Sequence, residues 1–333
     1  MDHQKQALKL GACVLIFAVF LRLFGGVCAA AATFLKDPQL AVFAIFLQTG
    51  RVIRPSPSEA PTAPADTEPS PSTGVIAPPE DALPVFSEED LNAVSLIYGC
   101  DYRPDLDALL QAPLSWDLTD GAPAVLILHT HGTEAYTSTP DTTYLPWGNY
   151  RTLDQHYNMV SIGAEVARLL EQNGITVIHD HTLHDYPSYS GSYSNARKTI
   201  QSYLDKYPSI RMVLDIHRDA LSTDSGEQLT TSAIVGGQRS AQIMLVMGTD
   251  AAGNHHPNWQ ANLALALKLT AQLERTDPGI TRPIYLRSER FNMDMTPGSL
   301  LVEIGASGNT HEEAVIAAHA LARGIIALAK GTS

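Results

Sequence analysis

The sequence has few cysteines, and their positions indicate no disulfide framework. Cys13 and Cys28 lie in an apolar N-terminal segment, and Cys100 is the single cysteine of the remaining chain. This pattern suits an exported protein that folds without disulfides. We expect Cys100 to be a small core residue rather than a nucleophile, because no histidine lies near it in the sequence.

Clusters of basic residues and internal repeats are also absent. The net charge is −13, and only 17% of the residues are charged. Binding to nucleic-acid phosphates requires a clustered basic face, so DNA and RNA are excluded as partners. With 333 residues, of which 44% are hydrophobic, the chain is long enough for one globular domain with appendages.

The first 35 residues form the longest apolar segment. Residues 10–34 are apolar over about the width of a bilayer and are interrupted only by Arg22. Residues 1–35 are therefore predicted to be a single-pass membrane anchor, with the domain that follows outside the cytoplasm. A cleaved signal peptide is the alternative, because "VCAAAA" offers small residues and Arg22 is costly inside a membrane. Both interpretations direct the chain to the cell membrane.

Three further segments follow the anchor. Residues 36–53 form a juxtamembrane segment whose apolar run is too short to span a bilayer. Residues 54–85 are rich in proline, serine, threonine and alanine, a composition typical of an extended linker without a core. Residues 86–333 are predicted to be the globular domain, held away from the membrane by this linker.

Strand-like and helix-like segments alternate in the globular domain. This pattern predicts an α/β fold with a mostly parallel central sheet flanked by helices. The expected strands cover residues 124–129, 175–180, 210–217, 241–248 and 299–305, and the expected helices cover residues 158–174, 194–208, 258–274 and 310–331.

Polar residues follow three of these strands at their carboxyl ends, where open α/β sheets bind ligands. The stretch "AVLILHTHGTEAY" places His131 and Glu134 after the first strand. "MVLDIHRDA" supplies His217 and Arg218, and "SLLVEIG" supplies Glu303. The three strand ends are therefore expected to meet in one site.

The predicted site binds zinc through His131, Glu134 and His217. Two imidazoles and one carboxylate suit zinc and leave a fourth position for water. Glu303 is the candidate general base, which would take a proton from this water and pass it to a leaving amine. Arg218 is a second candidate catalytic residue that could hold a substrate carboxylate or polarise a carbonyl. An ordinary buried network with Asp215 or Asp219 is equally compatible with the sequence.

Other polar residues have two interpretations each. Asp154 could be the third zinc ligand in place of Glu134, or it could cap the helix that begins near Asn158. Asp215 precedes His217 by two residues and could orient it, although the spacing alone does not show this. The histidines of "HDHTLHD" at 179–185 are expected to be structural or to contact substrate rather than to bind metal.

The motifs together carry a resemblance to a known family. "LHTHGTEAY", "HDYPSYSGSYSNAR", "LDIHRDA" and "FNMDMTPGSLLVEIG" resemble the stage II sporulation protein P family over about residues 90–330. The resemblance implies a fold similar to zinc-dependent N-acetylmuramoyl-L-alanine amidases and zinc carboxypeptidases. It also implies a peptidoglycan hydrolase that acts in sporulation, during engulfment, with stage II sporulation proteins D and M as partners.

The implied activity is cleavage of the amide between the glycan and the stem peptide, together with endopeptidase activity on peptide crosslinks. The amidase relatives imply a ligand near Asp154, whereas the carboxypeptidase-like alignment implies Glu134. Two other functions are compatible with the same residues: a carboxypeptidase-like zinc peptidase and an inactive cell-wall binding domain. Glu303 favours an enzyme, because a binding domain needs no carboxylate base at that strand end.

Overall fold

A computed structural model of the chain describes residues 85–114 and 118–331. The predicted anchor at 1–35, the juxtamembrane segment at 36–53 and nearly all of the linker at 54–85 lie outside the described residues. Across the ranges that are described, no helix combines the length and the apolar character needed to cross a membrane.

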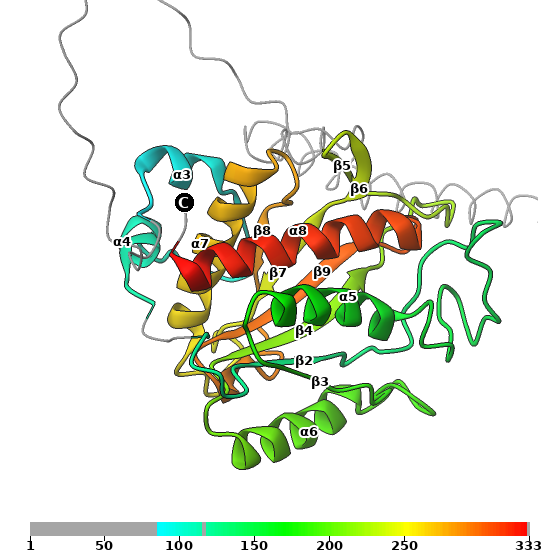
Figure 1. Cartoon of the computed structure of the whole chain (residues 1–333), viewed down its shortest axis with the longest axis horizontal. Coiled ribbons are helices and arrows are strands. Elements are labelled where there is room, and N and C mark those ends of the chain that lie inside the picture. The colour runs from blue at the N-terminus through cyan, green and yellow to red at the C-terminus, as the bar shows by residue number, and fades with distance from the viewer. Residues whose placement is uncertain (1–84, 115–117, 332–333) are drawn as a thin grey trace, which may run out of the picture. The chain divides into compact units, whose positions relative to one another are not determined.

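A seven-stranded sheet in the order β1-β8-β7-β9-β4-β2-β3 forms the centre of the domain (Figure 1). Its strands are β1 (Leu96–Tyr98), β2 (Val125–Leu128), β3 (Val177–His179), β4 (Met212–Asp219), β7 (Ile243–Met247), β8 (Ile284–Leu286) and β9 (Ser299–Ala306). A separate hairpin consists of β5 (Ser232–Val235) and β6 (Gln238–Ala241).

The sheet is mostly parallel, as predicted. Strands β3, β2, β4 and β9 are parallel neighbours, and so are β7, β8 and β1. The exception is the antiparallel pair β7 and β9. After β4 the chain passes through the β5–β6 hairpin, and β6 leads almost directly into β7 without the crossover helix that a parallel neighbour requires. Strand β7 therefore enters the sheet from the carboxyl edge of β9.

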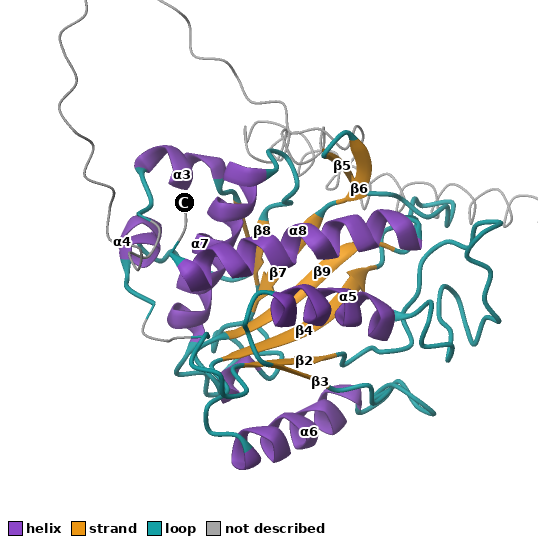
Figure 2. Ribbon diagram, viewed as in Figure 1, coloured by secondary structure: helices purple, strands orange, loops and turns teal. Residues whose placement is uncertain are grey.

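Helices flank the sheet (Figure 2). The long ones are α5 (Met159–Gln172), α6 (Ser192–Lys206), α7 (Trp259–Thr276) and α8 (His311–Lys330), and the short ones are α3 (Glu88–Ala93), α4 (Leu106–Gln111) and the 3-10 helix η1 (Met293–Met295). Helix α8 packs against both α5 and α7. The four long helices match the predicted ones, whereas α3, α4, β1, β8 and the hairpin were not predicted.

Both faces of the sheet are buried, as strand β2 shows. Val125 and Ile127 belong to the large hydrophobic cluster that contains residues of α5, α7 and α8. Leu126 and Leu128 point the other way, into a smaller cluster with Ile200 of α6. A strand covered on both faces needs apolar residues at every position, which explains the continuous apolar run before His129.

An ion pair adds to the hydrophobic packing that attaches helix α3 to the domain. Ser87 and Asp90 form a capping box at the start of α3. Asp90 also pairs with Arg275 in the last turn of α7. The Arg275 guanidinium holds the pKa of the Asp90 carboxyl well below its ordinary value of 3.8, so this carboxylate stays charged in mild acid.

The close approach of β4 and β9 depends on Gly298, which gives the first stability prediction. A Cβ atom at this position would lie 2.0 Å from the backbone oxygen of Arg211. Gly298→Ala should lower the free energy of unfolding by about 1–3 kcal/mol, measured by denaturant titration. Gly148→Ala is the matched control, because its Cβ would meet no atom closer than 3.9 Å. Equal free energies of unfolding for the two variants would show that β4 and β9 can move apart at Gly298 without loss of stability.

The ion pair of Asp90 and Arg275 gives a pH-dependent prediction. Because folding lowers the pKa of Asp90, the ionised carboxylate stabilises the folded state. This contribution to the free energy of unfolding is fully present above the unfolded pKa near 3.8 and is lost as the pH falls through the folded pKa. Asp90→Asn should therefore lower the melting temperature at pH 7, and the difference from wild type should shrink below about pH 4. Asp107→Asn, at an exposed position of α4, controls for the change in net charge. If the difference in melting temperature between Asp90→Asn and wild type grew in acid, the ionised Asp90 carboxylate would not be the stabilising form.

Candidate active site

The predicted site begins with a turn that follows β2 and is fixed by two buried carboxylates. Asp215 on the neighbouring strand β4 accepts hydrogen bonds from Thr130 N at 2.7 Å and from Thr130 Oγ1 at 2.6 Å. Asp185 accepts from Thr133 N at 3.2 Å and from Thr133 Oγ1 at 2.6 Å. The turn carries His131 between these two threonines, so its position is set from both sides.

The structure brings the three predicted zinc ligands together. His217 Nδ1 lies 3.6 Å from Glu134 Oε2. The rings of His131 and His217 are 5.2 Å apart between centroids and nearly perpendicular. All three residues are buried, with exposed fractions of 3–7%.

The donor chemistry of this group fits zinc. Ligands of one zinc ion lie about 2.0–2.2 Å from the metal, so an oxygen and a nitrogen 3.6 Å apart can share an ion after a small adjustment. On the other side of the His217 ring, Nε2 lies 2.8 Å from Asp215 Oδ1, an ion-pair contact outside the angles of a hydrogen bond. A carboxylate behind a ligating histidine is a common arrangement in zinc sites. The Nδ1 atom of His131 is buried and has no hydrogen-bond partner.

The group is looser than an assembled metal site. In residues 85–114 and 118–331, no three His, Cys, Asp or Glu side chains are gathered closely enough to hold an ion. Glu134 contacts positive groups instead: its Oε1 lies 3.2 Å from Arg151 and 3.7 Å from the Arg218 guanidinium. The ligand set of His131, Glu134 and His217 therefore stays a prediction.

Opposite charges govern the protonation of this group. Burial alone would raise the pKa of Glu134, but Arg218 and His217 lower it to about 2. Burial would likewise raise the pKa of Asp215, but His217 and Thr130 lower it to about 2. The pKa of His217 is raised well above 6.5, because the two carboxylates outweigh the effect of burial. Burial lowers the pKa of His131 to about 4.

Glu303 lies beside this group on strand β9. It is the register partner of His217 on the adjacent parallel strand, so both side chains point to the same face of the sheet. Its Oε2 atom is buried and has no hydrogen-bond partner. Burial raises the pKa of its carboxyl to about 8. A carboxylate whose buried oxygen has no hydrogen-bond partner and whose pKa is about 8 has the properties of a proton-transfer group.

Arg218 is buried and binds backbone carbonyl groups. Its guanidinium donates to the carbonyl oxygens of Ala135 at 3.0 Å and Tyr150 at 2.9 Å. Its backbone N–H donates to Glu134 Oε2 at 3.3 Å. Its Nη1 also donates to the backbone carbonyl of Asp219 at 3.4 Å, and the carboxylate that it faces is that of Glu134 rather than those of Asp215 and Asp219. These contacts are those of a buried network. Through these contacts Arg218 of β4 holds the turn after β2, at Ala135, next to the later part of the β2–α5 loop, at Tyr150.

Asp154 does not cap helix α5, so that interpretation is wrong. The N-cap is Asn158, whose side chain accepts from Val160 N at 3.0 Å. Asp154 is 42% exposed at its side chain and accepts from the backbone N–H of His156 at 3.0 Å. The helix begins only at Met159, and a cap must directly precede the first helical residue.

The histidines after β3 have structural contacts. His184 is buried and lies within hydrogen-bond distance of the His129 carbonyl and of Thr199 Oγ1. His179 Nε2 lies 2.9 Å from His129 Nε2, and His179 Nδ1 lies 3.1 Å from His181 Nε2. His179 and His181 thus pair with imidazoles, and His184 pairs with a carbonyl and a hydroxyl group. Of the two roles predicted for these histidines, structural or substrate-contacting, these contacts belong to the structural one.

Sequence reasoning missed four residues around the site. Tyr189 stacks on the His131 ring at 4.4 Å, and Tyr193 meets it edge-on at 5.5 Å. Arg151 joins Glu134 to Asp185, with its Nη1 2.6 Å from Asp185 Oδ2. Tyr189 lies in the loop after β3 and Tyr193 in the first turn of α6, so both follow β3 at the carboxyl edge of the sheet, and this position was the available signal.

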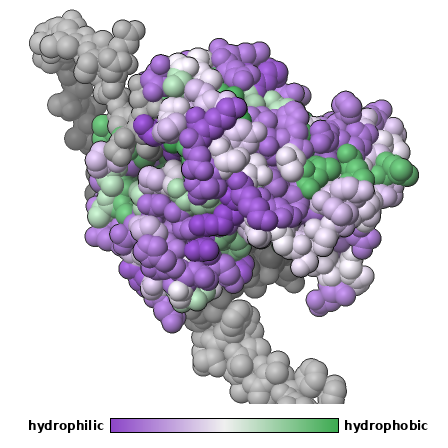
Figure 3. Space-filling model, turned by 90° about the horizontal axis from the view of Figure 1, so that it is seen from below, coloured by the Kyte–Doolittle hydropathy of each residue, from purple (hydrophilic) through white to green (hydrophobic). Residues whose placement is uncertain are grey.

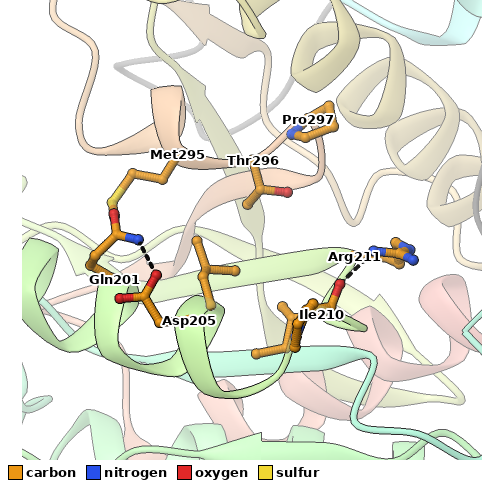
Figure 4. A pocket seen from close by; sticks show the side chains of 9 residues that line it. Gln201, Asp205, Ile210, Arg211, Met295, Thr296 and Pro297 are labelled. Carbon is orange, nitrogen blue, oxygen red and sulfur yellow. Dashed lines mark hydrogen bonds between the residues drawn. The ribbon is translucent and has the colours of Figure 1, made fainter.

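A separate pocket lies at the other edge of the sheet (Figure 4). It has a volume of about 460 Å³, and its lining includes Arg211, which directly precedes β4, and Pro297, two residues before β9. Gln201 donates to Asp205 at 2.8 Å within it. Because it lies at the amino ends of the strands whose carboxyl ends carry His217 and Glu303, it is not part of the candidate site.

Comparison with solved structures finds distant likenesses to amidases. N-acetylmuramoyl-L-alanine amidase AmiC2 of Nostoc punctiforme is 16% identical, with a TM-score of 0.36, and the match covers 62% of this chain and 96% of that one. The CwlD amidase from Clostridioides difficile, solved in complex with the GerS lipoprotein, is 16% identical, with a TM-score of 0.38 and coverage of 61% and 96%.

Comparison with known sequences identifies the family to which the chain belongs. Stage II sporulation protein P of Bacillus subtilis (strain 168) is 27% identical over 214 residues, which are 60% of this chain and 49% of the relative. The chain thus spans about half the length of that relative. The family model described as Stage II sporulation protein P matches residues 66–326. Since this match covers well over half of the sequence, the chain belongs to the stage II sporulation protein P family.

Proposed function

We propose that the chain is a zinc-dependent peptidoglycan hydrolase that cleaves the N-acetylmuramoyl-L-alanine amide and also cuts peptide crosslinks. The observation that carries the proposal is the meeting of His217, Glu134 and Glu303 at one edge of the sheet. Two of these residues fit a zinc ion, and the third, half-buried Glu303, has a buried carboxylate oxygen without a hydrogen-bond partner.

His131, Glu134 and His217 would hold the metal. Zinc, when bound, would supply a Lewis acid toward the scissile carbonyl and the attacking water. Asp215 orients His217 through the 2.8 Å contact at Nε2, so that Nδ1 faces Glu134. Arg218 is a positioning residue in this proposal, because its donors bind the carbonyl groups that shape the turn carrying Glu134.

Glu303 accepts a proton from the attacking water and transfers it to the leaving amine. The group must be ionised before attack and protonated before the amine departs, so its pKa must lie near the working pH. Burial places the pKa of Glu303 near 8, whereas Glu134 and Asp215 have values near 2 and cannot hold the proton at neutral pH. Among these carboxylates, Glu303 is therefore the suitable acid and base.

Family membership supports a role in sporulation, and the further assignments are part of the proposal. Residues 1–35 anchor the chain in the cell membrane, and residues 54–85 hold the hydrolase domain outside the cytoplasm. The substrate is peptidoglycan, cleaved during engulfment, and the protein partners are stage II sporulation proteins D and M.

Digestion of purified peptidoglycan by the full chain in detergent tests the proposed reaction. Mass analysis of the products should show free stem peptides and peptide-free glycan, and a chelator should prevent their release. Release of single C-terminal amino acids alone would identify a carboxypeptidase. Retention on the glycan without any product would identify a binding domain.

The two histidines should be required for metal binding and hydrolysis together. His131→Ala or His217→Ala should lower the zinc content of the purified chain and abolish product release, because loss of one of three ligands severely weakens a catalytic site. Elemental analysis measures the metal, and His255→Ala in an exposed loop is the control. Full zinc content and full rate in either site variant would remove that histidine from the ligand set.

Two carboxylate variants should separate the ligand from the base. Glu303→Gln keeps the shape of the side chain but removes the proton acceptor, so zinc content should stay unchanged while the rate falls by about 10²–10⁴-fold. Glu134→Gln should lose zinc, because a neutral amide is a poor ligand. The opposite result would mean that the two roles are exchanged. Zinc retention in both variants would make Asp154 the leading third ligand.

A further inference from the structure

Exposed hydrophobic side chains are concentrated beside the candidate site. Of the seven large hydrophobic residues that are exposed in residues 85–114 and 118–331, five lie on two loops. The β2–α5 loop carries three of them and the β3–α6 loop carries two. We name this set the aromatic rim; it consists of Leu145, Trp147, Leu153, Tyr186 and Tyr189.

The rim residues are exposed on the surface of the molecule. The β2–α5 loop, which carries three of them, projects at the right of Figure 1, and the face drawn in Figure 3 also has hydrophobic residues at its right-hand side. Leu145 is 86% exposed and Tyr189 is 55% exposed. A cluster of exposed apolar and aromatic groups next to a candidate site is a sign of ligand binding.

Buried polar contacts hold the two loops together. Arg151 of the first loop pairs with Asp185 of the second at 2.6 Å, and Asp185 has no exposed surface. Trp147 N donates to the Arg151 carbonyl at 2.8 Å, so the same arginine also fixes the backbone that carries the indole. The rings of Trp147 and Tyr186 meet edge to face at 5.4 Å. The rim is therefore a preformed surface.

The rim continues into the candidate site. Tyr189 stacks on His131 at 4.4 Å, and the Arg151 guanidinium lies 5.0 Å from the centre of the Tyr189 ring. Asp185 accepts hydrogen bonds from Thr133 in the turn between His131 and Glu134. A molecule that contacts both Trp147 and Tyr189 would thus extend to the predicted metal ligands.

The chemistry of the rim fits a sugar ring better than a peptide. The amide cut in the proposed function joins a saccharide on one side to a peptide on the other. A pyranose ring has an apolar face of C–H groups that packs on exposed aromatic rings, and its hydroxyl groups remain in water. The stem peptide carries carboxylates, which need cationic partners. Arg151, the cation beside the Tyr189 ring, is already paired with Asp185 and Glu134.

We infer that the aromatic rim is the subsite for the saccharide next to the scissile amide, with Trp147 and Tyr186 stacking on the glycan. This inference rests on the proposed function for the choice of ligand. The subsite gives the enzyme its direction on the substrate, with the glycan over the rim and the stem peptide on the other side of the predicted metal ligands.

The test measures binding of peptide-free glycan, a disaccharide repeat of N-acetylglucosamine and N-acetylmuramic acid, to the full chain by calorimetry. Trp147→Ala and Tyr186→Ala should each weaken glycan binding by about three- to tenfold, in line with the strength of aromatic contacts. Trp147→Phe should retain most of the affinity, because it keeps a ring. Ile234→Ala is the control, since Ile234 is 66% exposed on the β5–β6 hairpin.

Two further measurements make the outcome specific. On peptidoglycan, the rim variants should raise KM and leave kcat unchanged, with melting temperatures equal to wild type. Free stem peptide should bind to all variants with the same affinity. Three results would overturn the inference: variants that bind peptide rather than glycan more weakly, alanine variants that both bind glycan as tightly as wild type, or a wild-type chain that does not bind glycan. If the chain binds glycan through the rim but releases no product, the proposed hydrolysis fails and the subsite stands.

Discussion

The buried carboxylate of Asp215 is the interaction on which the site depends. One oxygen accepts from the backbone and the other from the hydroxyl of Thr130, and Oδ1 also faces His217 Nε2 at 2.8 Å. It joins the turn after β2 to strand β4 and directs His217 Nδ1 toward Glu134. A buried charge is costly unless it is paired, so this carboxylate, the threonine and the imidazole must keep their arrangement. The positions of the candidate ligands follow from it.

A second buried carboxylate, that of Asp185, fixes the loops beside the site in the same way, through hydrogen bonds and an ion pair. Asp185 binds Thr133 in the turn and Arg151 in the next loop. Arg151 also contacts Glu134, so the position of this candidate ligand depends on the position of the β2–α5 loop that carries Arg151. Glu303 differs from both, because its buried oxygen has no hydrogen-bond partner and its pKa rises instead of falling. The site therefore combines carboxylates that are fixed by hydrogen bonds with one carboxylate oxygen that has no such partner, and the proposed proton transfer by Glu303 rests on this difference.

Much of this arrangement was predictable from the sequence. Strands with continuous apolar runs, such as β2, and the polar residues after them identified the carboxyl edge of the sheet, because parallel strands must place these ends together. The antiparallel direction of β7 was not predictable, since it depends on how a hairpin returns the chain to the sheet. The pairing of Arg151 with Asp185 was also missed, because it joins residues 34 positions apart in two irregular loops. Nothing in either loop's local sequence selects that contact.

The position of zinc in a crystal of the full chain, located by anomalous scattering at the zinc edge, tests the proposed ligand set most directly. We expect one ion bound to His217 Nδ1 and Glu134, with His131 as the third protein ligand and Asp215 at His217 Nε2. Glu303 should lie near the ion without ligating it. An ion bound through His217 Nε2, or one held by Asp154 or Glu303 in place of Glu134, would show that the proposed ligand set is wrong.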